Sequence, residues 1–200
     1  MRNVLIIGAT GRLGRAATQT LLTETDDHIT LFARSAANLR VTDPARERVI
    51  AGDVMNARDL AAALAGQDTV FAALSGDLGT YATKLVAAME RQRVARLVFI
   101  TSMGIYNEIP ASVGGGNLNT NPILRPYRAA ADVIEASSLA YTIIRPGWFT
   151  PGPVNYEITH KGEPFGGHNV SIRSIADLVK RLVDNDQLYR QDSVGINTPQ

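Results

Sequence analysis

A glycine-rich segment near the start of the chain has the spacing of a phosphate-binding loop. An apolar run ends at Gly8, and Gly11 and Gly14 follow it, each pair separated by two residues. After a strand, these glycines allow a tight turn, a close approach of the main chain to a pyrophosphate, and close packing of the next helix. The amino terminus of that helix offers free N–H groups to the phosphates. The segment predicts a dinucleotide site that Thr10 and Leu13 also contact; the alternative is a turn that needs glycine for steric reasons alone.

Two arginines indicate which dinucleotide this site would bind. NAD-binding chains usually end their second strand with an acidic residue that binds the ribose hydroxyls. Here the second apolar run continues into Arg34 and Ser35, with no carboxylate at that end. A guanidinium at Arg34, with Arg12 from the glycine loop and the Ser35 hydroxyl, would bind a 2′-phosphate through charge-assisted hydrogen bonds. The sequence therefore predicts NADP(H) as the cofactor, and the alternative is two solvated surface arginines.

Other cofactor contacts are expected where the later strands end. Asp53 follows the third apolar run, where it would accept a hydrogen bond from the adenine amino group or cap the helix that begins near Asn56. The remaining expected contacts lie at the ends of the third, fourth, fifth and sixth runs or directly after them. They are Val54, Ala73, Leu74, Ser75, Thr101, Pro146 and Trp148.

These residues need a frame of alternating strands and helices, and the sequence predicts one. Apolar runs that lack polar alternation are typical of strands buried on both faces, and they span 3–8, 28–34, 47–53, 68–74, 95–102 and 140–147. Alanine-rich periodic segments predict helices over 13–23, 57–65, 80–93 and 127–137. A final helix is expected at about 174–184, and residues 194–198 suggest a last edge strand. This order predicts an α/β fold, a Rossmann-type doubly wound parallel sheet with a ligand crevice at the carboxyl ends of its strands.

Two segments interrupt the alternation. Residues 107–121 are rich in Gly, Asn and Pro, which predicts a mobile loop between the fifth strand and its helix. Residues 148–172 hold most of the later prolines, glycines and aromatic residues, and we expect a small irregular C-terminal cap with short strands over the crevice. At 200 residues, the chain 1–200 is expected to be a single NAD(P)-binding domain.

The assembled motifs resemble the atypical branch of the short-chain dehydrogenase/reductase superfamily, which includes NmrA-like proteins and flavin/biliverdin reductases. The resemblance rests on "GATGRLG", "GDV", "VFITSMGIY" and "EASSLAYTIIRPGWF", in this order. It implies a Rossmann domain with the nicotinamide at the carboxyl edge of the sheet. It also implies a catalytic serine and tyrosine, which match Ser102 and Tyr127. The lysine that the superfamily carries four positions after the tyrosine is replaced by Ala131.

The missing lysine leaves two functions open. In the superfamily this lysine lowers the pKa of the phenol, and a phenol with a pKa of about 10 is a poor acid–base catalyst at neutral pH. Trp148 stands where the flavin/biliverdin reductases have a histidine. Trp148 and Phe149 would stack on a planar hydride acceptor, or Trp148 would anchor the core of the cap. We therefore expect an NADPH-dependent reductase of a small planar or carbonyl acceptor; the alternative is a non-catalytic, NADP(H)-binding redox sensor.

Composition excludes several other classes. A formal net charge of +1 gives no basic surface for a nucleic acid, and the chain has no cysteine. His28, His160 and His168 lack the spacing of metal ligands, and no apolar run has the roughly 20 residues of a membrane span. We expect a cytoplasmic protein without a metal, monomeric or weakly dimeric, whose partner is a small-molecule hydride acceptor. Arg145 is expected to pair with a carboxylate on a helix.

Overall fold

A mostly parallel sheet forms the centre of the protein, as seen in a computed structural model that describes residues 1–199. Eight strands are ordered β3-β2-β1-β4-β5-β6-β10-β8, and only β8 is antiparallel to its neighbour. Their bounds are β1 Asn3–Ile7, β2 His28–Ala33, β3 Glu47–Ala51, β4 Thr69–Ala72, β5 Arg96–Ile100, β6 Ala140–Pro146, β8 Glu157–Thr159 and β10 Asp192–Asn197. The predicted α/β fold with a Rossmann-type sheet is confirmed.

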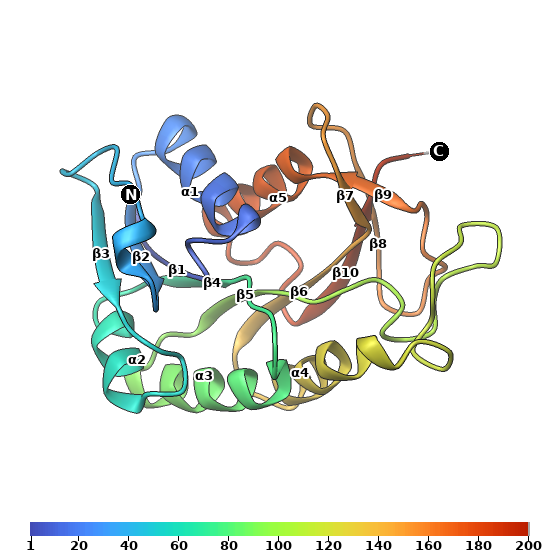
Figure 1. The fold of residues 1–200 in the computed structure, drawn as a ribbon, viewed down its shortest axis with the longest axis horizontal. Helices are drawn as coiled ribbons and strands as arrows, with labels where there is room; N and C mark the ends of the chain where they lie inside the picture. The colour runs from blue at the N-terminus through green and yellow to red at the C-terminus, as the bar shows by residue number, and fades with distance from the viewer. Residues whose placement is uncertain (200) are drawn as a thin grey trace.

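Helices cover both faces of this sheet (Figure 1). On one face lie α1 (Arg12–Glu24) and α5 (Ile172–Asp184), which pack against each other. On the other face lie α2 (Ala57–Leu64), α3 (Leu78–Gln92) and α4 (Arg125–Glu135). Two short 3-10 helices, η1 (Ala36–Asn38) and η2 (Pro122–Leu124), lie in the connections that follow β2 and β5.

The strands are buried because they pack against helices on both sides. All seven residues of β6 and all four of β4 are buried, which explains why these runs show no polar alternation. Alternate residues of one strand face opposite layers: Leu5 packs in the core under α2, α3 and α4, while Ile6 packs in the core under α1 and α5. The central strands thus belong to two apolar cores at once.

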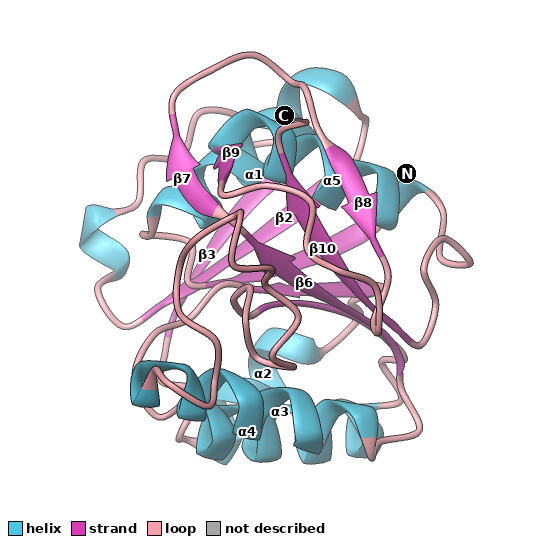
Figure 2. Cartoon of the chain, turned by 90° about the vertical axis from the view of Figure 1, so that its right-hand side faces the viewer, coloured by secondary structure: helices cyan, strands magenta, loops and turns pink. Residues whose placement is uncertain are grey.

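The last part of the chain differs from the prediction in one respect. Residues 192–197 form a strand, but β10 lies inside the sheet, parallel to β6 on one side and antiparallel to β8 on the other. The edge strand on this side of the sheet is therefore β8, and the expectation that residues 194–198 form an edge strand is wrong. Two further short strands, β7 (Trp148–Thr150) and β9 (Asn169–Ser171), pair in parallel and lie on the same side of the sheet as α1 and α5 (Figure 2).

The parallel arrangement brings the ends of β1 to β6 to one edge of the sheet. The glycine loop follows β1, Arg34 follows β2, and Thr101 and Ser102 follow β5. Side chains that are far apart in the sequence therefore meet at this carboxyl edge.

Candidate active site

The three loop glycines are required for different reasons. Gly8 has a φ of +87°, and a Cβ there would overlap the carbonyl oxygen of Ala73. A Cβ at Gly14 would overlap the carbonyl oxygen of Gly8, so both residues are glycine because the protein packs against itself there. At Gly11 a Cβ would meet only the Gly8 oxygen, at 3.2 Å, and nothing else within 4 Å. The fold itself demands least of Gly11, as expected if a ligand approaches the main chain at that point.

The amino terminus of α1 is suited to a phosphate group. Its N-cap residue, Gly11, provides no side-chain cap, and the first turn contains no acidic residue. Of the other long helices, α2, α3 and α5 are capped by the side chains of Asn56, Asp77 and Ser171, while α4 also has no side-chain cap. The first N–H groups of α1 lack the side-chain acceptor that α2, α3 and α5 have, and a pyrophosphate would supply it. The loop residues fit a dinucleotide on this ground.

The ends of β2 and β3 carry the side chains expected to bind the adenosine part. Arg34 and Ser35 are exposed immediately after β2, and no carboxylate within residues 1–199 forms an ion pair with Arg34. Asp53 follows β3, and its carboxylate accepts a hydrogen bond from the Met55 N–H at 2.9 Å. Asn56 caps α2 instead, by accepting from the N–H of Arg58, so the capping alternative for Asp53 is wrong. Its adenine contact stays a prediction, as does the contact of the buried Val54.

A pocket of about 320 Å³ opens between the ends of β5 and β6 and the start of α4. It brings together six of the residues that the sequence predicted for the site: Thr101, Ser102, Tyr127, Pro146, Trp148 and Phe149. The sequence did not single out the rest of its lining as a site wall: Met103, Gly116, Asn121, Ile123, Leu124 and Gly147. No charged residue lines this pocket, which we call the acceptor pocket.

The two candidate catalytic residues differ in what surrounds them. Thr101 is buried and donates to the Ile144 carbonyl, while the half-buried Ser102 donates to the Met103 carbonyl at 3.1 Å. Tyr127, at the start of α4, is half-buried on the pocket wall. One turn later Ala131 is fully buried, in the core that α3 and α4 share. No lysine ammonium stands beside Tyr127 at that position.

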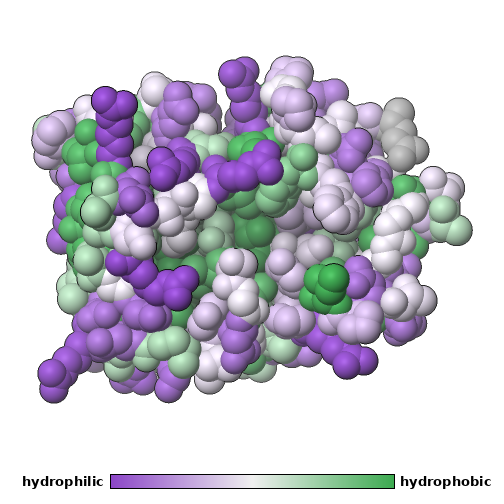
Figure 3. All heavy atoms as spheres, in the orientation of Figure 1, coloured by the Kyte–Doolittle hydropathy of each residue, from purple (hydrophilic) through white to green (hydrophobic). Residues whose placement is uncertain are grey.

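Trp148 forms an exposed aromatic wall at the mouth of the acceptor pocket. Its side chain is 64% exposed, so the alternative in which it anchors the core of a cap is wrong. It stacks against His168, with ring centroids 6.1 Å apart and planes 7° from parallel. Phe149 and Ile123, exposed by 38% and 74%, also line this pocket. In the orientation of Figure 1, apolar side chains show in a hollow near the middle of the molecular face, surrounded by polar ones (Figure 3).

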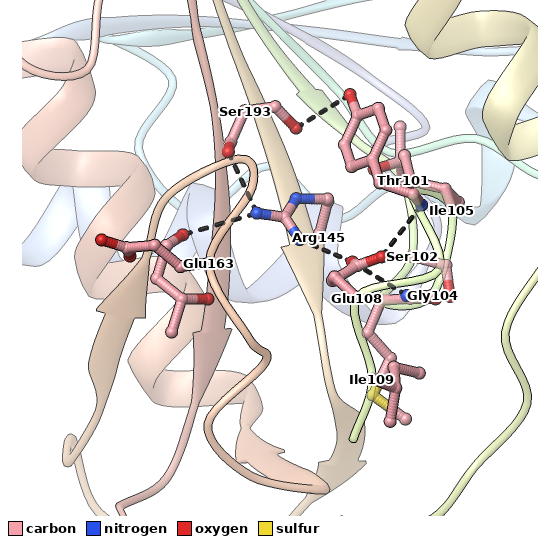
Figure 4. A network of polar contacts seen from close by, with 12 residues as sticks. Thr101, Ser102, Gly104, Ile105, Glu108, Ile109, Arg145, Glu163 and Ser193 are labelled. Atoms are coloured by element: carbon pink, nitrogen blue, oxygen red, sulfur yellow. Dashed lines mark hydrogen bonds and ion pairs between the residues drawn. The ribbon is translucent and has the colours of Figure 1, made fainter. Parts of the chain in front are cut away.

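A buried ion pair joins β6 to the loop that follows β5 (Figure 4). Arg145 of β6 is fully buried and pairs with Glu108 at 2.5 Å, in the loop after β5. Arg145 does pair with a carboxylate, but the prediction that this carboxylate lies on a helix is wrong, because Glu108 belongs to a loop. Glu108 also accepts from the N–H groups of Gly104 at 3.0 Å and Tyr106 at 2.9 Å. Burial, followed by a hydrogen bond to Glu135, raises the pKa of the Tyr106 phenol.

The remaining predicted residues lie along the same edge. Ala73, Leu74 and Ser75 follow β4 beside Gly8, and the Ala73 N–H donates to the Ile7 carbonyl. Arg12 lines a second cavity together with Arg173 of α5, and its contact with the 2′-phosphate stays a prediction. Sequence patterns do not single out Arg173, because an arginine in the first turn of a helix is ordinary.

Comparison with known proteins identifies the family. A family model described as NAD(P)H-binding matches residues 8–186, which includes the glycine loop, the candidate catalytic residues and α5. The chain belongs to this NAD(P)H-binding family. The family binds a nicotinamide dinucleotide, and this agrees with the uncapped helix terminus described above. None of the helices within residues 1–199 is long and apolar enough to cross a membrane.

Individual relatives include an NAD(P)H azoreductase and solved Rossmann-fold proteins. The chain is 29% identical over 175 residues to an NAD(P)H azoreductase of Xenophilus azovorans. The matched region covers 84% of this chain but only 57% of the azoreductase. It is 39% identical to a Rossmann-fold NAD(P)-binding protein of Shigella flexneri, with a TM-score of 0.86 over 100% of this chain and 94% of that one. A short-chain dehydrogenase/reductase of Veillonella parvula in complex with NADP is 26% identical, with a TM-score of 0.91 over 99% and 95% of the two chains. The predicted superfamily is confirmed, and the finer branch stays a prediction.

Proposed function

We propose that this protein is an NADPH-dependent reductase that transfers hydride to a small planar conjugated acceptor. The observation that carries the proposal is the acceptor pocket, whose exposed aromatic wall adjoins the strand ends where a nicotinamide would lie. The azoreductase relative supports a reductase that acts on a conjugated molecule. The pocket has no charged side chain, which favours an uncharged ring system over a polar sugar.

The residues present fit NADP(H) at the glycine loop and beyond it. The N–H groups at the start of α1 would bind the pyrophosphate, and Arg34 with Ser35 would bind the 2′-phosphate. Asp53 and Val54 would contact the adenine, while Ala73, Leu74 and Ser75 would flank the ribose beside the loop. Two observations favour NADP(H) over NAD(H): the exposed Arg34 stands where NAD-binding chains place a carboxylate, and one relative was solved in complex with NADP.

The bound cofactor would supply a hydride, and the side chains of the pocket would orient its acceptor. Trp148 and Phe149 offer aromatic faces on which a planar acceptor stacks. Ser102 has a hydroxyl that is free to rotate from the Met103 carbonyl toward an acceptor oxygen or nitrogen. Tyr127 lies on the same wall and would donate a hydrogen bond or a proton. Without a lysine to assist the phenol, an acceptor that is easily reduced needs alignment more than acid catalysis.

Turnover decides this proposal. The loss of NADPH absorbance would be followed with a panel of azo dyes, quinones, flavins, enones and unconjugated ketones. We expect turnover with the conjugated acceptors, and Trp148→Ala should raise their KM because the stacking surface is lost. Ile123→Ala serves as a control that shortens an apolar side chain of the same pocket mouth without removing an aromatic face.

A non-catalytic redox sensor is the second candidate function. The observation that favours it is Ala131, which is buried between α3 and α4 where the superfamily has its lysine. A sensor would bind NADPH tightly but fail to reduce every acceptor of the panel. In that case, NADP(H) binding would instead change the affinity of the protein for a partner.

A further inference from the structure

A second cavity lies near the carboxyl end of β7. It has a volume of about 690 Å³ and is lined by residues from the start of α1, the end of β7 and the start of α5: Arg12, Thr150, Pro151, Gly152, Ile172 and Arg173. Trp148 and Phe149 of β7 line the acceptor pocket, and Thr150 of the same strand lines this cavity. The three consecutive residues of β7 therefore line both the acceptor pocket and this second cavity.

The cavity has an excess of positive charge that the protein does not neutralise. Arg12 and Arg173 are both exposed, and neither forms an ion pair or a side-chain hydrogen bond within residues 1–199. Other arginines are paired: Arg46 with Asp43, and Arg128 with Asp132, both at 2.7 Å. No Asp or Glu is among the lining residues. Two unpaired guanidinium groups at one cavity favour an anionic ligand.

The position of the cavity indicates which anion this is. Arg12 is the first residue of α1, whose uncapped N–H groups form the expected pyrophosphate site. Both α1 and α5 run from the carboxyl edge of the sheet toward its opposite edge, so Arg173 approaches the start of α1 from the neighbouring helix. A pyrophosphate on the glycine loop would lie between the main chain of α1 and these two side chains.

We propose that Arg173 is a cofactor-binding residue, and that Arg12 and Arg173 together bind the pyrophosphate of NADP(H) from the side that faces α5. This inference rests on the proposed binding of a nicotinamide dinucleotide, but not on turnover. It gives Arg12 a different partner from Arg34, which remains the residue for the 2′-phosphate. Selection between NADPH and NADH would then depend on Arg34, and affinity for either would depend on Arg12 and Arg173.

Cofactor binding without any acceptor tests this inference. The dissociation constants of NADPH and NADH would be measured by calorimetry for the full chain and for Arg173→Gln, Arg12→Gln and Arg34→Gln. Because one charge-assisted hydrogen bond contributes about 1.5–3 kcal/mol, we expect Arg173→Gln and Arg12→Gln to raise both constants about 10- to 100-fold and by the same factor. Arg34→Gln should raise the constant of NADPH alone. Arg91→Gln, at the far end of α3, is the matched control and should change neither constant.

Three results would overturn the assignment. Unchanged constants in Arg173→Gln would show that its guanidinium does not contact the cofactor. A selective loss of NADPH binding would assign Arg173 to the 2′-phosphate. Unchanged cofactor binding with a raised KM for acidic acceptors would assign the cavity to the acceptor. Thermal unfolding without cofactor should match the unsubstituted protein, because Arg173 is exposed and unpaired within the described residues, so a change in binding is not a change in folding.

Discussion

Removal of Glu108 should destabilise the protein more than removal of its partner, Arg145. In Glu108→Ala the Arg145 guanidinium, which is fully buried, keeps its charge because arginine does not deprotonate in proteins. It keeps a hydrogen bond to the Ser193 carbonyl at 3.1 Å and the face of the Tyr106 ring at 5.3 Å, but it loses its counterion. Removal of one partner of a buried ion pair costs about 3–5 kcal/mol.

The opposite substitution leaves a carboxylate that still has hydrogen-bond donors. In Arg145→Met the Glu108 carboxylate keeps the N–H groups of Gly104 and Tyr106, at 3.0 and 2.9 Å. Because these two hydrogen bonds continue to stabilise the carboxylate, Arg145→Met should lose less stability than Glu108→Ala.

Chemical and thermal unfolding measure both effects. For a chain of this length, about 1 kcal/mol corresponds to about 2–4 °C in Tm, so Glu108→Ala should lower Tm by about 6–20 °C. The double variant Glu108→Leu, Arg145→Met removes both buried charges and should recover part of this loss, although two N–H groups lose their acceptor. The reasoning is refuted if Arg145→Met is the more damaging change, or if Glu108→Ala costs less than about 1 kcal/mol.

Three other predictions concern the glycine loop, the cofactor and the tyrosines. Gly8→Ala should unfold more readily than the unsubstituted protein, because the φ of Gly8 is +87° and an added Cβ would overlap a carbonyl oxygen. Gly11→Ala should keep most of the protein's stability but bind NADPH more weakly, which calorimetry would measure. Arg34→Ala should weaken NADPH about 10-fold or more and leave NADH almost unchanged; an equal loss for both cofactors would remove the 2′-phosphate assignment. Burial and then a hydrogen bond to Asp177 raise the pKa of Tyr156 to about 12. The stability that this shift contributes should therefore be present below about pH 10 and be lost as the pH rises from about 10 to 12. An ultraviolet pH titration should show a tyrosine that ionises near pH 12 in the unsubstituted protein but not in Tyr156→Phe.

The strands and helices that surround the cofactor edge could be predicted from local patterns. Continuous apolar runs mark β1, β2, β4, β5 and β6 because both faces of these strands are buried, whereas β3, at the edge of the sheet, is only partly buried. Periodic apolar segments mark the five long helices. The glycine loop could be predicted because its three positions respond to local geometry. The position of β10 in the sheet could not be predicted, because it depends on pairing with β6 and β8 and not on the residues of β10 alone.

The side-chain contacts of the site were predicted less completely. Ser102 and Trp148 could be placed in one pocket because each follows a strand at the same edge, and Tyr127 could be placed there from the resemblance to the superfamily. The Glu108 partner of Arg145 lies within a Gly- and Asn-rich loop, where sequence patterns do not determine which side chain turns inward. Arg173 became a candidate only because α5 packs beside α1, which is a contact between segments far apart in the chain.

The interior place of β10 has a consequence for the order in which the protein matures during synthesis. Residues 192–197 leave the ribosome after all other strands of the sheet, yet they fill the gap between β6 and β8. The Gly147 N–H, on the wall of the acceptor pocket, donates to the Ile196 carbonyl, so this wall gains its support last. A nascent chain can therefore assemble the dinucleotide half of the domain early, while the acceptor half waits for the final strand, and its exposed β6 edge is the surface that a chaperone would need to shield.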